Sequence, residues 1–237
     1  CYLNSIFFIL ESFPERKLIM VNSNPRKLLL SGWLKENGSA EYTSPLKLQK
    51  FLLFYEAFSK IDGDDSDFTY LKGYERGPVF SNVFGDYTHE RESFDIAAHQ
   101  EYALHSEQVN TVRAKRSHFI VSTLSAKELS SLTHKLNLWK SKENRIMNGE
   151  RQVELDEIDF NEEDWNLVTW LEKMYPESLI ENSYIANIDT HYFVFKKDDV
   201  EKLTAQHFDI LSNLADNAEL INPVYVELDE EGRLIVD

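Results

Sequence analysis

The apolar run that follows Ser44-Pro45 constrains the fold more than any other segment of this sequence. Ser44 is a good N-cap, and proline suits the first helical position because it lacks the N–H group that would be unpaired there. We therefore expect a helix from Pro45 to a stop at Asp62-Gly63. Apolar residues occupy so much of its circumference that this helix should be central and contacted from several sides. Those residues are Leu46, Leu48, Phe51, Leu52, Leu53, Phe54, Tyr55, Ala57, Phe58 and Ile61.

Three other segments carry helix signals. An apolar pattern over residues 24–36 stops at Asn37-Gly38 and predicts a preceding helix. Ser125 and Glu128 have the spacing of a capping box and predict a helix over the leucines that follow. Asn161 is the expected cap of a third helix, with Phe160 packed against Trp165.

The remaining elements are shorter. Residues 68–71 read as a strand, Gly77-Pro78 as a rigid turn, and residues 79–87 as a helix. In the last quarter of the chain, residues 192–195 read as a strand and Asp198 with Glu201 as the start of a helix toward Leu214. Alternation over 224–228, a turn, and residues 234–236 predict a hairpin.

These elements predict an α+β fold that is predominantly α-helical. We expect a helical core domain with a small antiparallel β element, followed by a C-terminal α/β extension. The expected boundaries are an N-terminal extension over 1–23, the helical domain over 24–175, and an acidic extension over 176–237 packed on the main domain. Residues 1–19 precede Met20 and are set apart from the fold argument.

Composition excludes several classes of protein. The single Cys1 excludes an internal disulfide scaffold and a cysteine zinc site, and it fits a reducing compartment. No apolar run reaches the length of about 20 residues that a membrane helix needs, and the run Ile6–Leu10 is too short to span. We therefore expect a soluble, cytoplasmic protein with no membrane partner.

Charge is concentrated in the last third of the chain. Of the net charge of −16, residues 150–237 carry −17, with 6 Lys and Arg against 23 Asp and Glu. That excess is more than solubility requires, since a net charge of about 2–8 is ample for a small domain. We expect this acidic region to dock on a basic partner. The locally basic stretch 113–145 should pair with the adjacent acidic stretch 150–164, which makes a nucleic-acid partner unlikely.

Catalytic signatures are missing from the sequence. The 8 glycines never form a phosphate-binding loop, the seven histidines are scattered, and no Gly-x-Ser-x-Gly elbow occurs. We therefore predict a protein that is not an enzyme, with no catalytic residues, no cofactor and no metal. His134, late in its helix, is expected to be a hydrogen-bonded structural histidine. A hydrolase whose catalytic residues are distant in sequence is a weaker alternative.

Three segments together resemble the Panacea antitoxin domain, also known as the SocA-like domain. The first is residues 44–55, SPLKLQKFLLFY; the second is YERGPVF at 74–80 followed by VFGDY at 83–87; the third is LSAKEL at 124–129 through LTH at 132–134 to Trp139-Lys140. Order and approximate spacing agree over residues 24–175. Arg76 stands where the family often has an aromatic or small polar residue, and the tail after Pro176 has no counterpart in the basic domain.

The resemblance implies a mostly helical domain and the antitoxin of a toxin–antitoxin pair, which neutralises a toxin by direct binding. A proteolytic adaptor that delivers a bound toxin to a protease is one alternative, and a nucleic-acid-binding regulator using residues 113–145 is another. Such genes are common in bacteria and their mobile elements. The residues predicted to contact the partner are Phe54, Phe58, Arg76, Gly77, Pro78, Val79, Tyr87, Glu162, Glu163 and Asp164.

Overall fold

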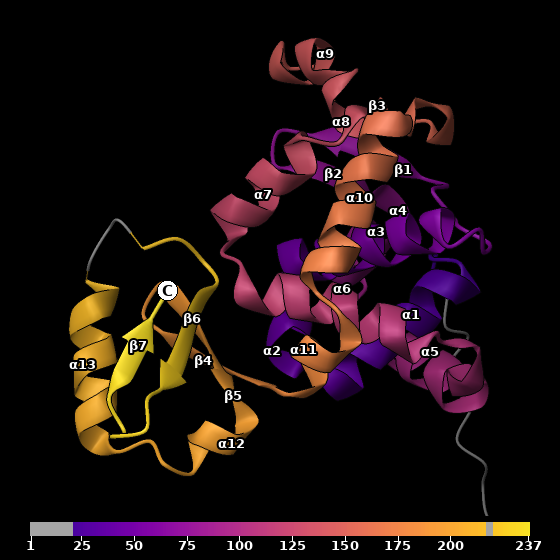
Figure 1. Ribbon diagram of the computed structural model, residues 1–237. Helices are drawn as coiled ribbons and strands as arrows, with labels where there is room; N and C mark the ends of the chain where they lie inside the picture. The colour runs from indigo at the N-terminus through magenta and orange to yellow at the C-terminus, as the bar shows by residue number, and fades with distance from the viewer. Residues whose placement is uncertain (1–20, 217–219) are drawn as a thin grey trace, which may run out of the picture.

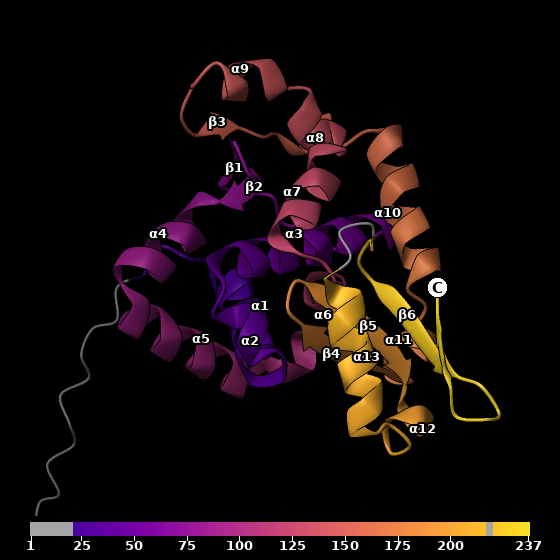
Figure 2. The same cartoon turned by 90° about the vertical axis from the view of Figure 1, so that its left-hand side faces the viewer.

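A computed structural model describes residues 21–216 and 220–237 of the chain. Within these residues the protein is predominantly helical, with two small sheets, so the expected fold class is confirmed. Figure 1 shows a helical body that holds most of the chain and, at one side of it, a smaller C-terminal unit in gold. The same unit lies away from α5 in the rotated view of Figure 2.

The body contains eleven of the described α-helices, two short 3₁₀ segments and one sheet. The helices are α1 Pro25–Asn37, α2 Ser39–Tyr42, α3 Pro45–Ile61, α4 Ser81–His89, α5 Arg91–His105, α6 Thr111–Thr123, α7 Ala126–His134, α8 Asn137–Lys140, α9 Glu143–Met147, α10 Glu162–Met174 and α11 Glu177–Glu181. The 3₁₀ segments are Ser106–Gln108 and Glu157–Asp159. The sheet has the order β2-β1-β3, with β1 Leu71–Tyr74, β2 Gly77–Phe80 and β3 Val153–Glu154, all antiparallel.

Helix α3 is the centre of the body, as its sequence predicts. Every residue from Leu48 to Ser59 is buried, because α1, α6, α7, α10 and β2 all contact the helix. Phe54 is 1% exposed and Phe58 is 0% exposed. The prediction that these two phenylalanines contact a partner is therefore wrong, since helices on every side of α3 leave no outer face for them.

The predicted helix caps are present. The side chain of Ser44 accepts a hydrogen bond from the N–H of Lys47, with Pro45 at the first helical position. Ser125 and Glu128 form both hydrogen bonds of the capping box at the start of α7. At α10, Asn161 caps the helix, and the rings of Phe160 and Trp165 meet edge to face.

Three local predictions in the first half of the chain differ from the structure. The strand expected over 68–71 begins instead at Leu71, because Tyr70 lies in the left-handed region with φ of 62° and the chain turns there. Gly77 and Pro78 are strand residues at the start of β2, and the turn before them is formed by Glu75 and Arg76. The helix expected over 79–87 begins only at Ser81.

The C-terminal unit is built on a mixed sheet of order β4-β5-β6-β7, in which β5 and β6 run parallel and the other pairs antiparallel. Its elements are β4 Ser183–Ile188, β5 His191–Lys196, α12 Lys197–Val200, α13 Ala205–Ala215, β6 Val224–Leu228 and β7 Leu234–Val236. The predicted hairpin is present, but the helix toward Leu214 starts after Thr204 rather than at Asp198. The unit has a small core of its own, formed by Ala186, Phe193, Phe195, Leu211, Ala215, Val224 and Val226.

Polar contacts join the C-terminal unit to the start of two body helices. Glu128 accepts hydrogen bonds from the backbone N–H of Asn222 at 3.3 Å and from its side-chain amide at 3.0 Å. The ammonium group of Lys47 lies 4.7 Å from the centroid of the Tyr192 ring. Val194 of β5 is also part of the body's core. The unit therefore packs against the same end of the body at which α3 and α7 begin.

The N-terminal boundary of the body lies earlier than expected. The buried carboxylate of Asp86 accepts four hydrogen bonds, two from Asn22 and two from Ser23, at 2.6–2.9 Å. These two residues are therefore part of the body rather than of an extension. Residues 1–20, including the stretch before Met20 that was set apart, lie outside the described residues.

Candidate functional site

A half-open cavity of about 570 Å³ lies between the start of α3, the β1–β2 hairpin and the first residue of α7. It is lined by Ser44, Pro45, Leu46, Gln49, Lys50, Tyr74, Glu75, Arg76, Val79, Phe84 and Ala126. Most of the wall is apolar, and the polar groups gather at Gln49-Lys50 and at the hairpin turn. This volume lies in the range of about 300–1,000 Å³ that is typical of ligand sites.

The hairpin that forms one side of the cavity depends on Gly77. Its φ of 98° lies in the region that favours glycine. A Cβ atom there would overlap the Nζ atom of Lys50 and lie 2.7 Å from Oγ1 of Thr133. Gly77 is therefore required both by the backbone conformation and by the close approach of α3 and α7 to the strand.

Lys50 lies beneath this hairpin, 1% exposed. Its ammonium group donates hydrogen bonds to the carbonyl oxygens of Arg76 at 2.9 Å and Pro78 at 3.3 Å. No carboxylate lies within ion-pair distance of it among residues 21–216 and 220–237. Because burial disfavours the charged form without a compensating anion, the pKa of Lys50 falls to about 7.

An aromatic pair supports the hairpin from the other side. The indole N–H of Trp139 donates to the carbonyl oxygen of Tyr74 at 3.0 Å, and the ring of His134 stacks on Trp139 with centroids 3.8 Å apart. Burial and the nearby Lys50 charge lower the pKa of His134. Its Nε2 atom is buried and has no hydrogen-bond partner in the described part of the chain, so the expectation of a hydrogen-bonded histidine is not met at this atom.

The structure places only some of the predicted contact residues at the cavity. Arg76 and Val79 line the cavity, with Arg76 exposed at its rim, and Gly77 and Pro78 are buried directly beneath. Tyr87 is buried, and its hydroxyl donates to the carbonyl oxygen of Tyr42 at 2.6 Å, so the prediction of a partner contact there is wrong.

The acidic residues predicted at the start of α10 have different roles. Glu162 and Glu163 are exposed and do not line the cavity. Asp164 is fully buried and accepts hydrogen bonds from the backbone N–H groups of Asn137 at 2.5 Å and Leu138 at 3.0 Å, at the start of α8. The prediction that Asp164 contacts a partner is therefore wrong, because its carboxylate caps a neighbouring helix.

Gln49 and Lys50 are the buried polar residues of the site that the sequence analysis missed; it also did not select Tyr74, Phe84 and Ala126. Both polar residues occur within an apolar helix whose other buried residues are mostly core, and a lysine held only by carbonyl oxygens has no sequence pattern. A polar pair inside such a helix is nevertheless a usable signal, since buried polar groups require partners that the helix itself does not supply.

The basic stretch 113–145 is largely neutralised within the chain. Lys140, Lys142 and Arg145 pair with the acidic stretch 150–164, as expected, through Glu163, Asp159 and Glu150. The other pairs differ from the prediction: Arg113 binds Asp62 and Asp64, Arg116 binds Glu172, and Lys115 binds Glu181. These pairs leave the stretch without a continuous cationic face.

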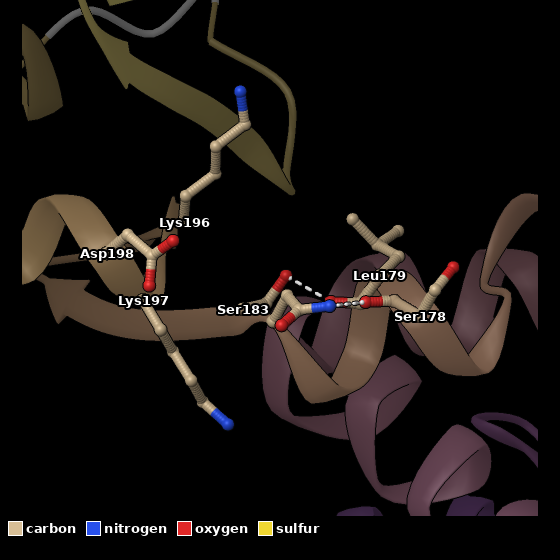
Figure 3. A pocket seen from close by; sticks show the side chains of 7 residues that line it. Ser178, Leu179, Ser183, Lys196, Lys197 and Asp198 are labelled. Carbon is tan, nitrogen blue, oxygen red and sulfur yellow. Dashed lines mark hydrogen bonds between the residues drawn. The ribbon is translucent and has the colours of Figure 1, made fainter.

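A second hollow, of about 390 Å³, lies between α11 and the end of β5. Two of its polar side chains are hydrogen-bonded to the backbone beside them (Figure 3): the side-chain amide of Asn182 donates to the carbonyl oxygen of Ser178, and Ser183 donates to that of Leu179. Lys196 pairs with Glu227, and Lys197 donates to the carbonyl oxygen of Glu181. Most of the polar side chains around this hollow are thus already bonded, and Asp198 is exposed, so the cavity under the hairpin is the better candidate site.

Within residues 21–216 and 220–237, no helix is long and apolar enough to cross a membrane. The same residues contain no cluster of three or more His, Cys, Asp or Glu side chains that could hold a metal ion. Comparisons with protein-family models, with curated proteins and with solved structures found no match to this chain.

Proposed function

We propose that this protein is the antitoxin of a toxin–antitoxin pair and that it neutralises its partner by binding it through the cavity under the β1–β2 hairpin. One observation supports this most strongly. The three segments that resemble the Panacea domain are far apart in sequence, yet each contributes to this one cavity. The first supplies Gln49 and Lys50, the second Arg76 and Val79, and the third Ala126.

The apolar wall favours a protein partner. Tyr74 and Phe84 lie with ring centroids 6.5 Å apart, and Phe84 is 37% exposed. An exposed aromatic group beside a cavity with a polar rim is typical of a surface that takes an anchor side chain from another protein.

The acidic surface of the C-terminal unit supports a basic partner. Residues 183–237 hold 4 Lys and Arg against 12 Asp and Glu. All four cations are engaged with acidic residues or a carbonyl oxygen of the chain, which leaves the negative charge in excess. Such a surface accelerates association with a basic protein. An association rate that does not fall between low and high salt would contradict this part of the proposal.

The test is neutralisation of the adjacent gene's product in a bacterial host. Growth arrest caused by that product should be relieved by the wild-type chain and not by Ala126→Glu, which places a charge in the cavity. An acidic residue is favourable in the first turn of a helix, so this variant should fold. Ala103→Glu, on an exposed face of α5, is the matched control and should still restore growth.

The same assay distinguishes neutralisation from proteolytic delivery. A simple antitoxin leaves a stable complex that can be purified, whereas an adaptor makes the partner disappear when the host protease is present. Equal rescue by Ala126→Glu and Ala103→Glu would contradict the assignment of the cavity as the contact surface.

A further inference from the structure

The polar groups in the cavity wall are mainly hydrogen-bond donors, and Gln49 is the clearest of them. It is 3% exposed, and its Oε1 atom accepts a hydrogen bond from the N–H of Phe80 at 2.7 Å. Because that partner is a donor, the oxygen of the amide must face it, and the NH₂ group is left on the other side. This NH₂ group donates to no atom of residues 21–216 and 220–237, and Gln49 lines the cavity.

Two basic side chains add to these donors. Lys50, buried under the hairpin, donates to two carbonyl oxygens and has no carboxylate of the described chain within ion-pair distance. Arg76 is exposed at the rim, and its guanidinium makes no ion pair within those same residues. The only acidic residue of the wall is Glu75, which is exposed at the hairpin turn. The cavity therefore favours a ligand with hydrogen-bond acceptors and negative charge.

The rest of the wall favours a ligand that has an apolar group next to its negative charge. Pro45, Leu46, Val79 and Ala126 line the cavity together with the tilted ring pair of Tyr74 and Phe84. The C-terminal residue of a protein chain has both properties, since its α-carboxylate and its side chain are attached to the same carbon. An internal Asp or Glu would need room for the chain to leave in two directions.

We propose that the cavity binds the C-terminal residue of the partner protein, with its free α-carboxylate held by Gln49 and Arg76 and its apolar last side chain between Tyr74, Val79 and Phe84. This inference rests on the proposed function, because it names the part of the partner that enters the cavity. A basic partner is compatible with it, since every chain with an unmodified end carries this carboxylate.

The test uses two forms of one hexapeptide, acetyl-Gly-Ser-Gly-Ser-Leu-Phe, with a free carboxylate or a C-terminal amide. Binding to the full chain is followed by changes in the backbone amide NMR signals of Phe80 and Arg76. The acid should bind at least about tenfold more tightly than the amide, because hydrogen bonds to charged groups are worth about 1.5–3 kcal/mol. A third peptide that carries an internal Phe-Asp pair and an amidated end tests the side-chain carboxylate as the source.

The decisive variant is Gln49→Glu. It keeps an acceptor for the N–H of Phe80, so the fold is retained, but it replaces the NH₂ donors with a second carboxylate oxygen. Affinity for the acid peptide should fall at least about tenfold, while affinity for the amide form stays within about twofold. Arg76→Ala should weaken the acid peptide by a smaller factor. Arg151→Ala, at an exposed arginine that does not line the cavity, is the matched control.

Equal binding of acid and amide, preference for the internal acid, or no signal change with either terminal form would each overturn the inference. Its failure can be told apart from failure of the proposed function. If the partner is still neutralised after its last three residues are removed, the carboxylate site is wrong and the antitoxin function stands. If the acid peptide binds but the adjacent gene's product is not neutralised, the antitoxin function is wrong and the carboxylate site stands.

Discussion

Two regions of the body each bury a lysine, and the difference between them is informative. Lys27 of α1 has its Nζ atom 2.5 Å from a carboxylate oxygen of Glu56 and 3.5 Å from one of Asp67. Lys50 of α3 is bound only by carbonyl oxygens. Burial lowers the pKa of both lysines, but nearby carboxylates oppose that effect only at Lys27. The fold thus supplies a counter-ion in one region and none beside the cavity.

Replacing Glu56, which binds Lys27, should have the largest effect on stability. Glu56→Leu leaves Lys27 and Arg26 without the carboxylate that both bind. We expect the free energy of unfolding to fall by about 3–5 kcal/mol, because the shorter ion pair of a buried ammonium group is lost and Asp67, at 3.5 Å, offsets its charge only in part. Urea denaturation measures this. The double variant Lys27→Met/Glu56→Leu is the control and should recover part of the loss; an equal or larger loss would show that the charge is not the cause.

The next largest effect should come from the hairpin above Lys50. Gly77→Ala forces a Cβ into contact with Lys50 and Thr133 at a φ that disfavours alanine. We expect a loss of stability of about 3 kcal/mol, measured by thermal or urea unfolding. Gly149→Ala is the matched control, since Gly149 also has a positive φ but open space around it, and it should cost about 1 kcal/mol.

A pH series compares Lys50 with a variant that lacks the charge. The folded pKa of about 7 lies below the unfolded value of about 10.4. Below pH 7 both states are protonated and the full cost of burying the charge is present. Between these two values the unfolded chain keeps a proton that the folded chain releases, so stability rises with pH, by up to about 1.4 kcal/mol per unit.

Lys50→Met should therefore lack this rise. The quantity to measure is the difference in unfolding free energy between wild type and Lys50→Met from pH 7.5 to pH 9. Groups remote from Lys50 titrate alike in both proteins, and His134, whose pKa the Lys50 charge lowers, titrates below this range. A difference that stays constant over this range would contradict the assigned pKa of Lys50.

The smallest effect concerns a third lysine, Lys47, one turn before Lys50 and partly exposed. Lys47→Ala removes the cation–π contact with Tyr192 and should cost less than about 1 kcal/mol. Amide hydrogen exchange in β5 should nevertheless become faster, because this contact joins the C-terminal unit to α3. Lys60→Ala, at the other end of the same helix, is the control and should leave exchange in β5 unchanged.

Much of the fold follows from local sequence, but the site does so only in part. The Ser44-Pro45 start and the Ser125–Glu128 capping box were correctly predicted, because short side-chain-to-backbone hydrogen bonds fix them. The helix that begins after Thr204 was misplaced, because His207 takes the position in its capping box where Glu or Gln is expected. A local pattern is sufficient where the stabilising partner is a few residues away.

The contact residues required long-range information. Phe54, Phe58, Tyr87 and Asp164 were assigned to a partner, but segments distant in sequence bury them. Arg76 and Val79 do line the cavity. They were predicted as contact residues because of the resemblance, not because of hydrophobic periodicity. Lys50 lies within the first of the resembling segments, but its role was not predicted, because the two carbonyl oxygens that hold it belong to the backbone of a hairpin distant in sequence.

The carboxylate of Glu128 has a consequence for how the two parts of the molecule respond to each other. It closes the capping box of α7 and at the same moment holds Asn222 of the C-terminal unit. Helix α7 supplies Ala126 to the cavity wall and Thr133 beside Gly77. Moving the C-terminal unit away from the body would break the hydrogen bonds of Asn222 to Glu128 and would also weaken the first turn of α7, which borders the cavity. A protein that binds both parts would therefore contact two surfaces whose positions are coupled through Glu128.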